Sequence, residues 1–187
     1  YGSRRGNHEI MMRGTFANVR VRNQLTPDKE GWWTIYHPTK ELTSVFEAAE
    51  KYKDDNTPTM ILGSALYGVG SSRDWAAKGP ALLGVKAVIS KNYERIHRAN
   101  LIGMGVLPLE FIDEQGWREL NLTGKETYDI IGLTEGITPK KRLKVVVHKD
   151  DESSVEFEVT TRLDSDIEIE YFLHGGILPY LVTQLLK

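Results

Sequence analysis

The sequence predicts an α/β domain with a mainly parallel central sheet flanked by helices, followed by a β-meander and a C-terminal helix. Two short apolar runs, at 57–64 and 85–90, alternate with helix-like segments. That order gives parallel strands joined by right-handed crossover helices. A later stretch alternates apolar and polar residues with period two, as the strands of a meander do. The chain has 187 residues and no repeat or clear linker, so we expect residues 1–187 to form one domain.

The N-terminal part predicts strands and one helix. Alternation over 16–21 indicates a strand, and the aromatic segment 31–39 is rich in residues that favour strands. The polar loop between them contains Pro27 and Gly31, which fits a hairpin or a wider excursion. Segment 41–55 places its apolar side chains on one stripe, so we expect an amphipathic helix there.

The middle of the chain predicts the parallel unit. The run 57–64 is short, apolar and bounded by turn residues, as a buried parallel strand is. Helices are expected at 73–84 and 92–105, and strands at 85–90 and 105–111. Beyond them, meander strands are expected at 127–133, 142–150 and 154–163. The tail 166–187 is helical in character and is expected to break at Gly175 and Gly176.

Composition excludes several classes of site. The chain has 24 basic and 26 acidic residues, so bulk electrostatic binding to nucleic acid or membrane is not indicated. No apolar run is long enough to span a bilayer, and no membrane partner is expected. Cysteine is absent, which excludes disulfides, thiolate metal sites and thiolate-held iron–sulfur clusters within this chain. Because the chain begins with Tyr1 rather than Met, we expect a piece of a longer polypeptide.

The segment YGVGSSRDWAAKG, residues 67–79, combines a flexible turn, two hydroxyls and a guanidinium before a helix. In a parallel sheet, ligands bind where strands end and loops lead into helices. Ser71 and Ser72 would lie near a helix N-terminus, which favours anions, and Arg73 offers a two-pronged donor for a carboxylate. A plain helix cap with surface charges explains the same residues about equally well. From the residues alone, an anion site of unspecified chemistry and a simple cap both stay open.

Longer motifs show a family resemblance. YGVGSSRDWAAKG, GVKAVISKNYERIHRANLIGMGVLPLEF, RGTFANVR and IEYFLHGGILPY closely resemble the C-terminal swivel domain of the aconitase family, and the match extends over nearly the whole chain. It is closest to the branch of bacterial aconitase A and the iron-regulatory proteins. The resemblance implies a single swivelling domain of a hydro-lyase that interconverts citrate and isocitrate through cis-aconitate. It also implies a [4Fe–4S] cluster in the full-length enzyme, held by the three preceding domains and not ligated by this chain.

The resemblance also implies roles for individual residues. Ser71 matches the catalytic serine, which removes a proton from the carbon next to a carboxylate. Ser72 and Arg73 match substrate-binding positions, and Arg13 in MRGTFANVR matches an arginine that grips a substrate carboxylate. Without the resemblance, a salt bridge beside a strand would be the preferred interpretation of Arg13. The charged residues of YERIHRAN are interpreted as structural polar contacts rather than catalytic groups: Glu94, Arg95, His97 and Arg98.

One departure and three alternatives accompany the resemblance. The family usually has charged or polar residues just before the Tyr-Gly of the serine motif, whereas this chain has Ala65 and Leu66. The alternatives are a contribution to binding RNA hairpins, as in the iron-regulatory proteins, a 2-methylcitrate or 2-methylisocitrate dehydratase, and an isopropylmalate dehydratase-like small subunit. The resemblance implies a cytoplasmic location, or the mitochondrial matrix for a eukaryotic source.

Overall fold

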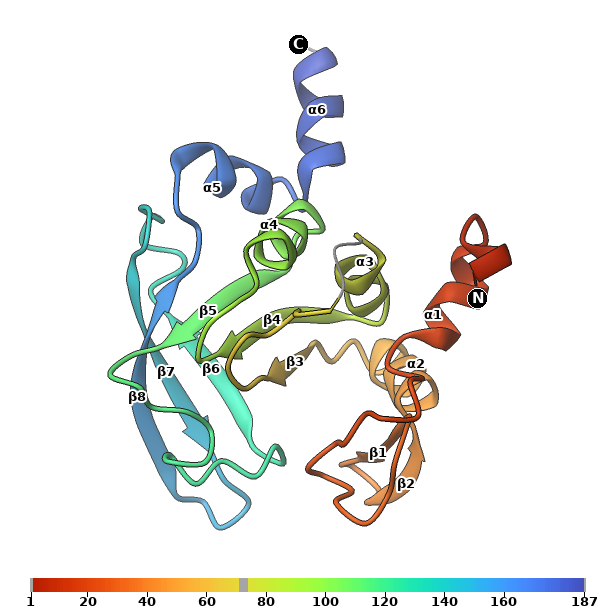
Figure 1. Ribbon diagram of the computed structural model, residues 1–187. Coiled ribbons are helices and arrows are strands. Elements are labelled where there is room, and N and C mark those ends of the chain that lie inside the picture. The colour runs from red at the N-terminus through yellow and green to blue at the C-terminus, as the bar shows by residue number, and fades with distance from the viewer. Residues whose placement is uncertain (1, 71–73, 187) are drawn as a thin grey trace.

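The computed structural model describes residues 2–70 and 74–186, and it contains one curled six-stranded sheet with helices packed against it (Figure 1). The sheet order is β3-β4-β5-β8-β7-β6, and a separate two-stranded hairpin pairs β1 with β2. The described elements are η1 (Gly2–Arg4), α1 (His8–Gly14), β1 (Trp33–Tyr36), β2 (Glu41–Ser44), α2 (Val45–Asp54), β3 (Thr59–Leu62), α3 (Trp75–Leu82), β4 (Val85–Ser90), α4 (Arg95–Gly103), β5 (Leu107–Phe111), β6 (Thr127–Ile131), β7 (Arg142–His148), β8 (Ser154–Thr161), α5 (Asp166–Leu173) and α6 (Ile177–Leu185).

The predicted α/β class, with its meander and C-terminal helix, is confirmed. Strands β3, β4 and β5 pair in parallel, as expected for strands joined by α3 and α4. Strands β6, β7 and β8 form an antiparallel meander. The two parts form one mixed sheet because β8 pairs antiparallel with β5, with Glu110 opposite Thr160.

The core lies on both faces of the parallel strands. On β4, Val88 packs with Ala77 of α3 and Leu101 of α4, and all three side chains are fully buried. The next residue, Ile89, faces the other side and packs into the hollow of the curled sheet, where Val145 also lies. Burial on both faces explains why β4 is apolar without alternation. Figure 1 shows α3 and α4 covering the outer side of β4 and β5.

The predicted strand at 16–21 is wrong. The chain forms α1 just before it, because the Asn7 side chain accepts hydrogen bonds from the backbone N–H groups of Glu9 (3.1 Å) and Ile10 (3.3 Å) and so caps the helix. After the helix, Phe16 adopts a positive φ of 59°, which breaks any extended run. The alternation at 16–21 therefore has no neighbouring strand to pair with, and the segment forms turns.

The predicted helix at 41–55 is correct only from Val45 onward. Its first four residues form β2, which pairs with β1, so the hairpin partner of the aromatic segment lies after it rather than before it. Ser44 and Glu47 form a capping box, in which each side chain accepts from the other's backbone N–H. This reciprocal cap fixes the start of α2 at Val45, directly after the last residue of β2.

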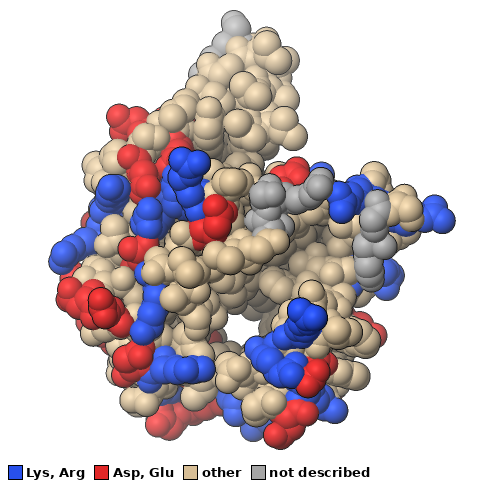
Figure 2. All heavy atoms as spheres, viewed as in Figure 1, with Lys and Arg blue, Asp and Glu red and all other residues tan. Residues whose placement is uncertain are grey.

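The tail breaks at the two glycines, as predicted. Gly176 has a φ of +130°, and a Cβ there would lie 2.6 Å from the Gly103 carbonyl oxygen at the end of α4. Helix α6 follows, with no buried residue, and its Leu178 is 69% exposed. It projects from the body as an uncharged arm (Figure 2). In the part of the chain that the structure describes, no helix has the length and apolar character required to cross a membrane.

Candidate active site

The predicted site lies where the loop after β3 leads into α3. Ser71, Ser72 and Arg73 lie outside the described residues. The chain is described up to Gly70 and again from Asp74, whose carbonyl oxygen accepts hydrogen bonds from the backbone N–H groups of Ala77 (2.9 Å) and Lys78 (2.8 Å). The described part of α3 begins at Trp75. The strand–loop–helix order expected for a ligand site of an α/β sheet is therefore present.

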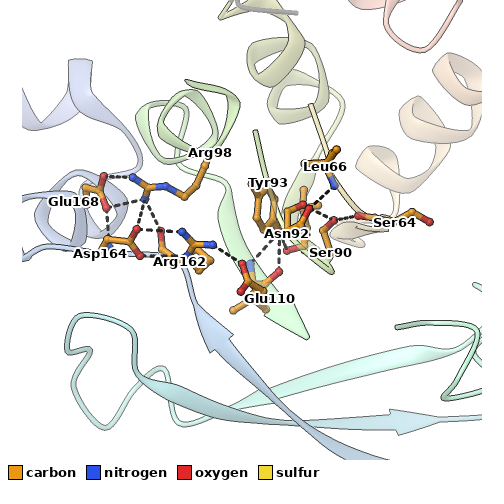
Figure 3. A network of polar contacts seen from close by, with 12 residues as sticks. Ser64, Leu66, Ser90, Asn92, Tyr93, Arg98, Glu110, Arg162, Asp164 and Glu168 are labelled. Carbon is orange, nitrogen blue, oxygen red and sulfur yellow. Dashed lines mark hydrogen bonds and ion pairs between the residues drawn. The ribbon is translucent and has the colours of Figure 1, made fainter. Parts of the chain in front are cut away.

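The loop at 64–70, which leads from β3 to Ser71, is held against the connection between β4 and α4 (Figure 3). Tyr67 donates its backbone N–H to the Asn92 carbonyl (3.0 Å), and its own carbonyl accepts the N–H of Glu94 (2.9 Å). The backbone N–H of Leu66 donates to the Asn92 side chain. These bonds form a short parallel bridge outside the main sheet, so the loop is fixed to the neighbouring strand's connection rather than free in solvent.

A buried serine holds the beginning of the same loop. Ser90, at the end of β4, has no exposed surface, and its hydroxyl donates to the Ser64 carbonyl. The backbone N–H of Gly63 donates to the Ile89 carbonyl at 2.7 Å. A Cβ on Gly63 would lie 2.8 Å from Cδ2 of Tyr67, so only glycine permits this close approach.

Tyr67 belongs to the loop and Tyr93 lies behind it, and neither is suited to act as a base. The Tyr93 hydroxyl lies 2.8 Å from both the Val88 and Leu109 carbonyl oxygens and accepts the Leu109 N–H at 3.2 Å. Burial raises the pKa of Tyr93 well above its ordinary value and that of Tyr67 to about 12. Both hydroxyls therefore stay protonated at neutral pH, and their rings, 6.0 Å apart, serve as packing.

The Ala65–Leu66 departure leaves the described backbone attachment of the loop intact, because the bond from Leu66 to Asn92 uses the backbone N–H. Leu66 has a positive φ of 55°, and its side chain is 60% exposed. Val69 is 62% exposed. The loop therefore presents two apolar side chains to the surface directly before Ser71.

Arg13 lies near the end of α1, not beside a strand, so the interpretation as a strand-side salt bridge is wrong. Its guanidinium carbon is 4.4 Å from the centre of the Phe46 ring of α2, and no ion pair of Arg13 occurs among the described residues. The C-terminal end of α1 packs closely against α3. A Cβ added to Gly79 of α3 would lie only 2.3 Å from the hydroxyl oxygen of Thr15, the residue that follows α1. The fold thus brings the helix of Arg13 beside the helix that follows the serine motif.

A line of charged side chains behind the loop joins α4, α5, β5 and the segment between β8 and α5 (Figure 3). Arg98 makes a two-pronged contact with Glu168, at 2.9 and 2.8 Å, and donates to the Arg162 carbonyl at 2.7 Å. Arg162 in turn contacts Asp164 and Glu110. Although partial burial opposes the shift, hydrogen bonds from Arg98 and the Asp164 N–H hold the pKa of Glu168 below its usual value.

Two of the charged residues of YERIHRAN, Glu94 and Arg98, make contacts that hold the fold together. Glu94 caps α4 by accepting the backbone N–H of His97 at 2.8 Å, and Arg98 belongs to the charged line. His97 differs, since neither of its ring nitrogens has a hydrogen-bond partner among the described residues. No local sequence pattern marks Ser90 and Asn92, which hold the loop. Their distance of about twenty-six residues from it left no local signal.

The chain does not supply a ligand set for an iron–sulfur cluster. Its sequence contains no cysteine, and no group of three or more side chains suited to hold a metal occurs in the described ranges 2–70 and 74–186. Any cluster would need its thiolate ligands from outside residues 1–187.

A family model described as the aconitase C-terminal domain matches residues 1–114. The chain belongs to this family. Aconitate hydratase A of Pseudomonas aeruginosa is 52% identical over 186 residues, and that of Bacillus subtilis is 49% identical over 187 residues. Both alignments cover 100% of this chain and 20% of the relative. Aconitate hydratase A of Thermus thermophilus is 48% identical over 187 residues, covering 100% of this chain and 21% of the relative. The chain therefore spans about a fifth of the length of these curated relatives.

One solved structure is also similar in fold. The crystal structure of 3-isopropylmalate dehydratase from Methanocaldococcus jannaschii aligns with a TM-score of 0.50 and 23% identity, covering 77% of this chain and 80% of that one. At that identity the likeness supports the fold alone, and it agrees with the α/β architecture described above.

Proposed function

We propose that residues 1–187 are the swivel domain of an aconitate hydratase-type hydro-lyase, acting on a tricarboxylate through cis-aconitate. The observation that carries this proposal is the family match together with about 50% identity to aconitate hydratases over the whole chain. The loop after β3 supports it, because its backbone is held on one side and leads directly to the serine motif at a ligand-binding edge of the sheet.

In this proposal the chain supplies the base and the carboxylate grips. Ser71, as an alkoxide, takes the proton from the carbon next to a substrate carboxylate. The electron pair of that C–H bond forms the double bond, and the hydroxyl on the neighbouring carbon leaves as hydroxide, for which a Lewis acid outside this chain would be the acceptor. Hydration reverses these steps. A serine alkoxide requires nearby N–H donors and positive charge, which a helix N-terminus and Arg73 would supply. Arg73, Ser72 and Arg13 bind carboxylates, and a guanidinium offers the two-pronged geometry that a carboxylate fits.

A [4Fe–4S] cluster belongs to the proposed full-length enzyme and not to this chain, which lacks ligands for it. When bound, such a cluster supplies a Lewis acid. The proton transfer and the carboxylate contacts assigned above are made by residues of this chain. The cluster-bearing domains are proposed to precede it, since the chain matches about a fifth of its relatives' length and the family model describes a C-terminal domain.

The exposed apolar surface of α6 supports a larger assembly. Leu178, Leu181, Val182, Leu185 and Leu186 are all between 46% and 86% exposed, on an arm that contains no charged residue between Gly175 and Leu186. An apolar surface of this kind marks a contact with another folded part. We assign that part to the preceding domains of the same polypeptide. A cytoplasmic location belongs to the same proposal.

The test is turnover by the full-length protein, purified without oxygen and with its cluster intact. Citrate, isocitrate, 2-methylcitrate and 3-isopropylmalate are supplied separately, and the ultraviolet absorbance of the unsaturated product is followed. We expect citrate and isocitrate to give cis-aconitate. Residues 1–187 alone should give none. Turnover only with 3-isopropylmalate or only with 2-methylcitrate would replace the proposed substrate, and robust turnover by residues 1–187 alone would overturn the division of the site.

A further inference from the structure

His97 is a buried titratable side chain to which the proposed reaction gives no role. It lies in the first turn of α4, is 2% exposed, and has both ring nitrogens without a hydrogen-bond partner among the described residues. Burying polar nitrogens without partners costs free energy. Because the ring nitrogens make no hydrogen bond among the described residues, the role of the side chain has to be read from the groups that its ring contacts.

The ring lies directly beneath the loop that leads to the serine motif. A Cβ on Gly68 would lie 2.3 Å from Cγ of His97, 2.4 Å from its Cβ and 2.5 Å from its Cδ2. The Gly68 backbone therefore rests on the imidazole with no intervening atom. Gly68 has a φ of +93°, so the chain turns at the point of contact in a conformation that glycine favours.

The ring is itself held in place from two sides. The backbone N–H of His97 donates to the Glu94 carboxylate at 2.8 Å, which fixes the first turn of α4. The Tyr67 ring packs against the imidazole with ring centres 5.3 Å apart. Tyr67 is also hydrogen-bonded through its backbone to the residues that precede α4. Backbone hydrogen bonds at Tyr67 therefore join the loop to the start of α4, and at the next residue, Gly68, the imidazole of His97 sets the distance between loop and helix.

We propose that His97 is a positioning residue: its imidazole is the spacer that sets the height and direction of the Gly68–Gly70 turn, and so the approach of Ser71 to the substrate. This inference rests on the proposed function and adds a residue to it. His97 acts through the loop and touches no substrate. The property that matters is an aromatic ring of this size beneath Gly68. A merely structural residue would affect stability, whereas a spacer affects the chemical step.

The experiment uses the full-length enzyme with its cluster and compares four variants by kcat, KM, cluster absorbance and thermal unfolding. His97→Ala removes the spacer, His97→Phe keeps an aromatic ring of similar size, and Gly68→Ala forces the loop off the ring. His148→Phe is the matched control, since His148 lies on β7 and is exposed. We expect His97→Ala and Gly68→Ala to lower kcat about 10- to 100-fold with cluster absorbance unchanged, the size expected of a misplacement of about 1 Å. His97→Phe should stay within about threefold of the parent, as should the control.

Each outcome of this comparison either supports or overturns the spacer role of His97. If His97→Ala retains its kcat, or if His97→Phe loses as much kcat as His97→Ala, the spacer role is wrong. If His97→Ala fails to fold, the comparison between Gly68→Ala and His97→Phe decides: a large loss of kcat in the first with retention in the second supports the inference, and any other pattern overturns it. Failure of the proposed function looks different, because the unaltered enzyme would then fail to convert citrate or isocitrate.

Discussion

Replacing Arg98 by alanine is expected to destabilise the domain substantially. The Arg98 side chain is 11% exposed and that of Glu168 is 19% exposed, and the two make a two-pronged contact at 2.9 and 2.8 Å. Arg98 also donates to the Arg162 carbonyl at 2.7 Å. The alanine variant would remove the guanidinium donors from the partly buried Glu168 carboxylate and from the Arg162 carbonyl. The Asp164 N–H would be the described donor that Glu168 keeps.

The magnitude follows from the burial of the pair. Removing one partner of a fully buried ion pair costs about 3–5 kcal/mol, and a hydrogen bond to a charged group contributes about 1.5–3 kcal/mol. Since this pair keeps some solvent contact, we expect the free energy of unfolding to fall by about 2–3 kcal/mol. With a urea dependence of about 2 kcal/mol per molar, the midpoint should move by about 1 M.

The assay is urea unfolding of residues 1–187, followed by tryptophan fluorescence and circular dichroism. Arg142→Ala is the matched control, because Arg142 and Glu158 are 66% and 60% exposed and 3.7 Å apart, where an ion pair contributes about 0–1 kcal/mol. Equal midpoint shifts for the two variants would refute the reasoning that burial and two-pronged geometry decide the effect. So would an Arg98→Ala midpoint that matches the unaltered domain.

Three further predictions concern pH, substrate binding and RNA. Burial lowers the pKa of His97, with nearby Glu94 acting in the opposite direction. At a pH below about 6.5, the ordinary pKa of histidine, the unfolded chain therefore binds more protons at this residue than the folded chain does. The free energy of unfolding should therefore fall from pH 6.5 toward pH 5. His97→Phe should flatten that part of the urea-midpoint profile, and an unchanged slope would contradict the assignment. In the full-length enzyme, Arg73→Lys and Arg13→Lys should raise KM about tenfold or more, since lysine keeps the charge but loses the two-pronged contact; unchanged kinetics would remove the assigned residue from the substrate grip. If the domain contributes to RNA hairpin binding through arginine–phosphate contacts, affinity should fall steeply between two salt concentrations, and a flat or absent titration signal for residues 1–187 would exclude that contribution.

The sequence predicted the sheet well because burial imposes clear patterns on its strands. Burial on both faces makes β4 largely apolar, with Lys86 as its exposed residue, and one-sided burial makes β7 alternate, with Val145 and Val147 buried between more exposed neighbours. The N-terminal part was less predictable. The four residues of β2 carry no strong strand signal of their own and were absorbed into the helix that follows, and α1 depends on the cap at Asn7.

The site was predictable as a motif but not as an assembled structure. Glycines, serines and an arginine in one segment mark a candidate ligand loop, although a plain helix cap explained the same residues about equally well from local sequence alone. The residues that hold the loop lie at the end of β4 and in the connection from β4 to α4, and their role depends on tertiary contacts. Ser90 and Asn92 read as ordinary polar residues at a strand end. His97 was interpreted as a structural polar contact, whereas the fold buries it beneath Gly68 and its ring nitrogens have no hydrogen-bond partner among the described residues.

The central claim is that this chain supplies the base for a hydro-lyase whose other residues lie in preceding domains. The most direct measurement is the turnover of isocitrate by the full-length enzyme and its Ser71→Ala variant, with substrate affinity and cluster absorbance determined on the same samples. The account predicts that kcat falls about 10²- to 10⁴-fold, the contribution of a positioned general base, while affinity stays within a few-fold and the cluster absorbance is unchanged. Near-normal turnover by Ser71→Ala with an intact cluster would contradict it.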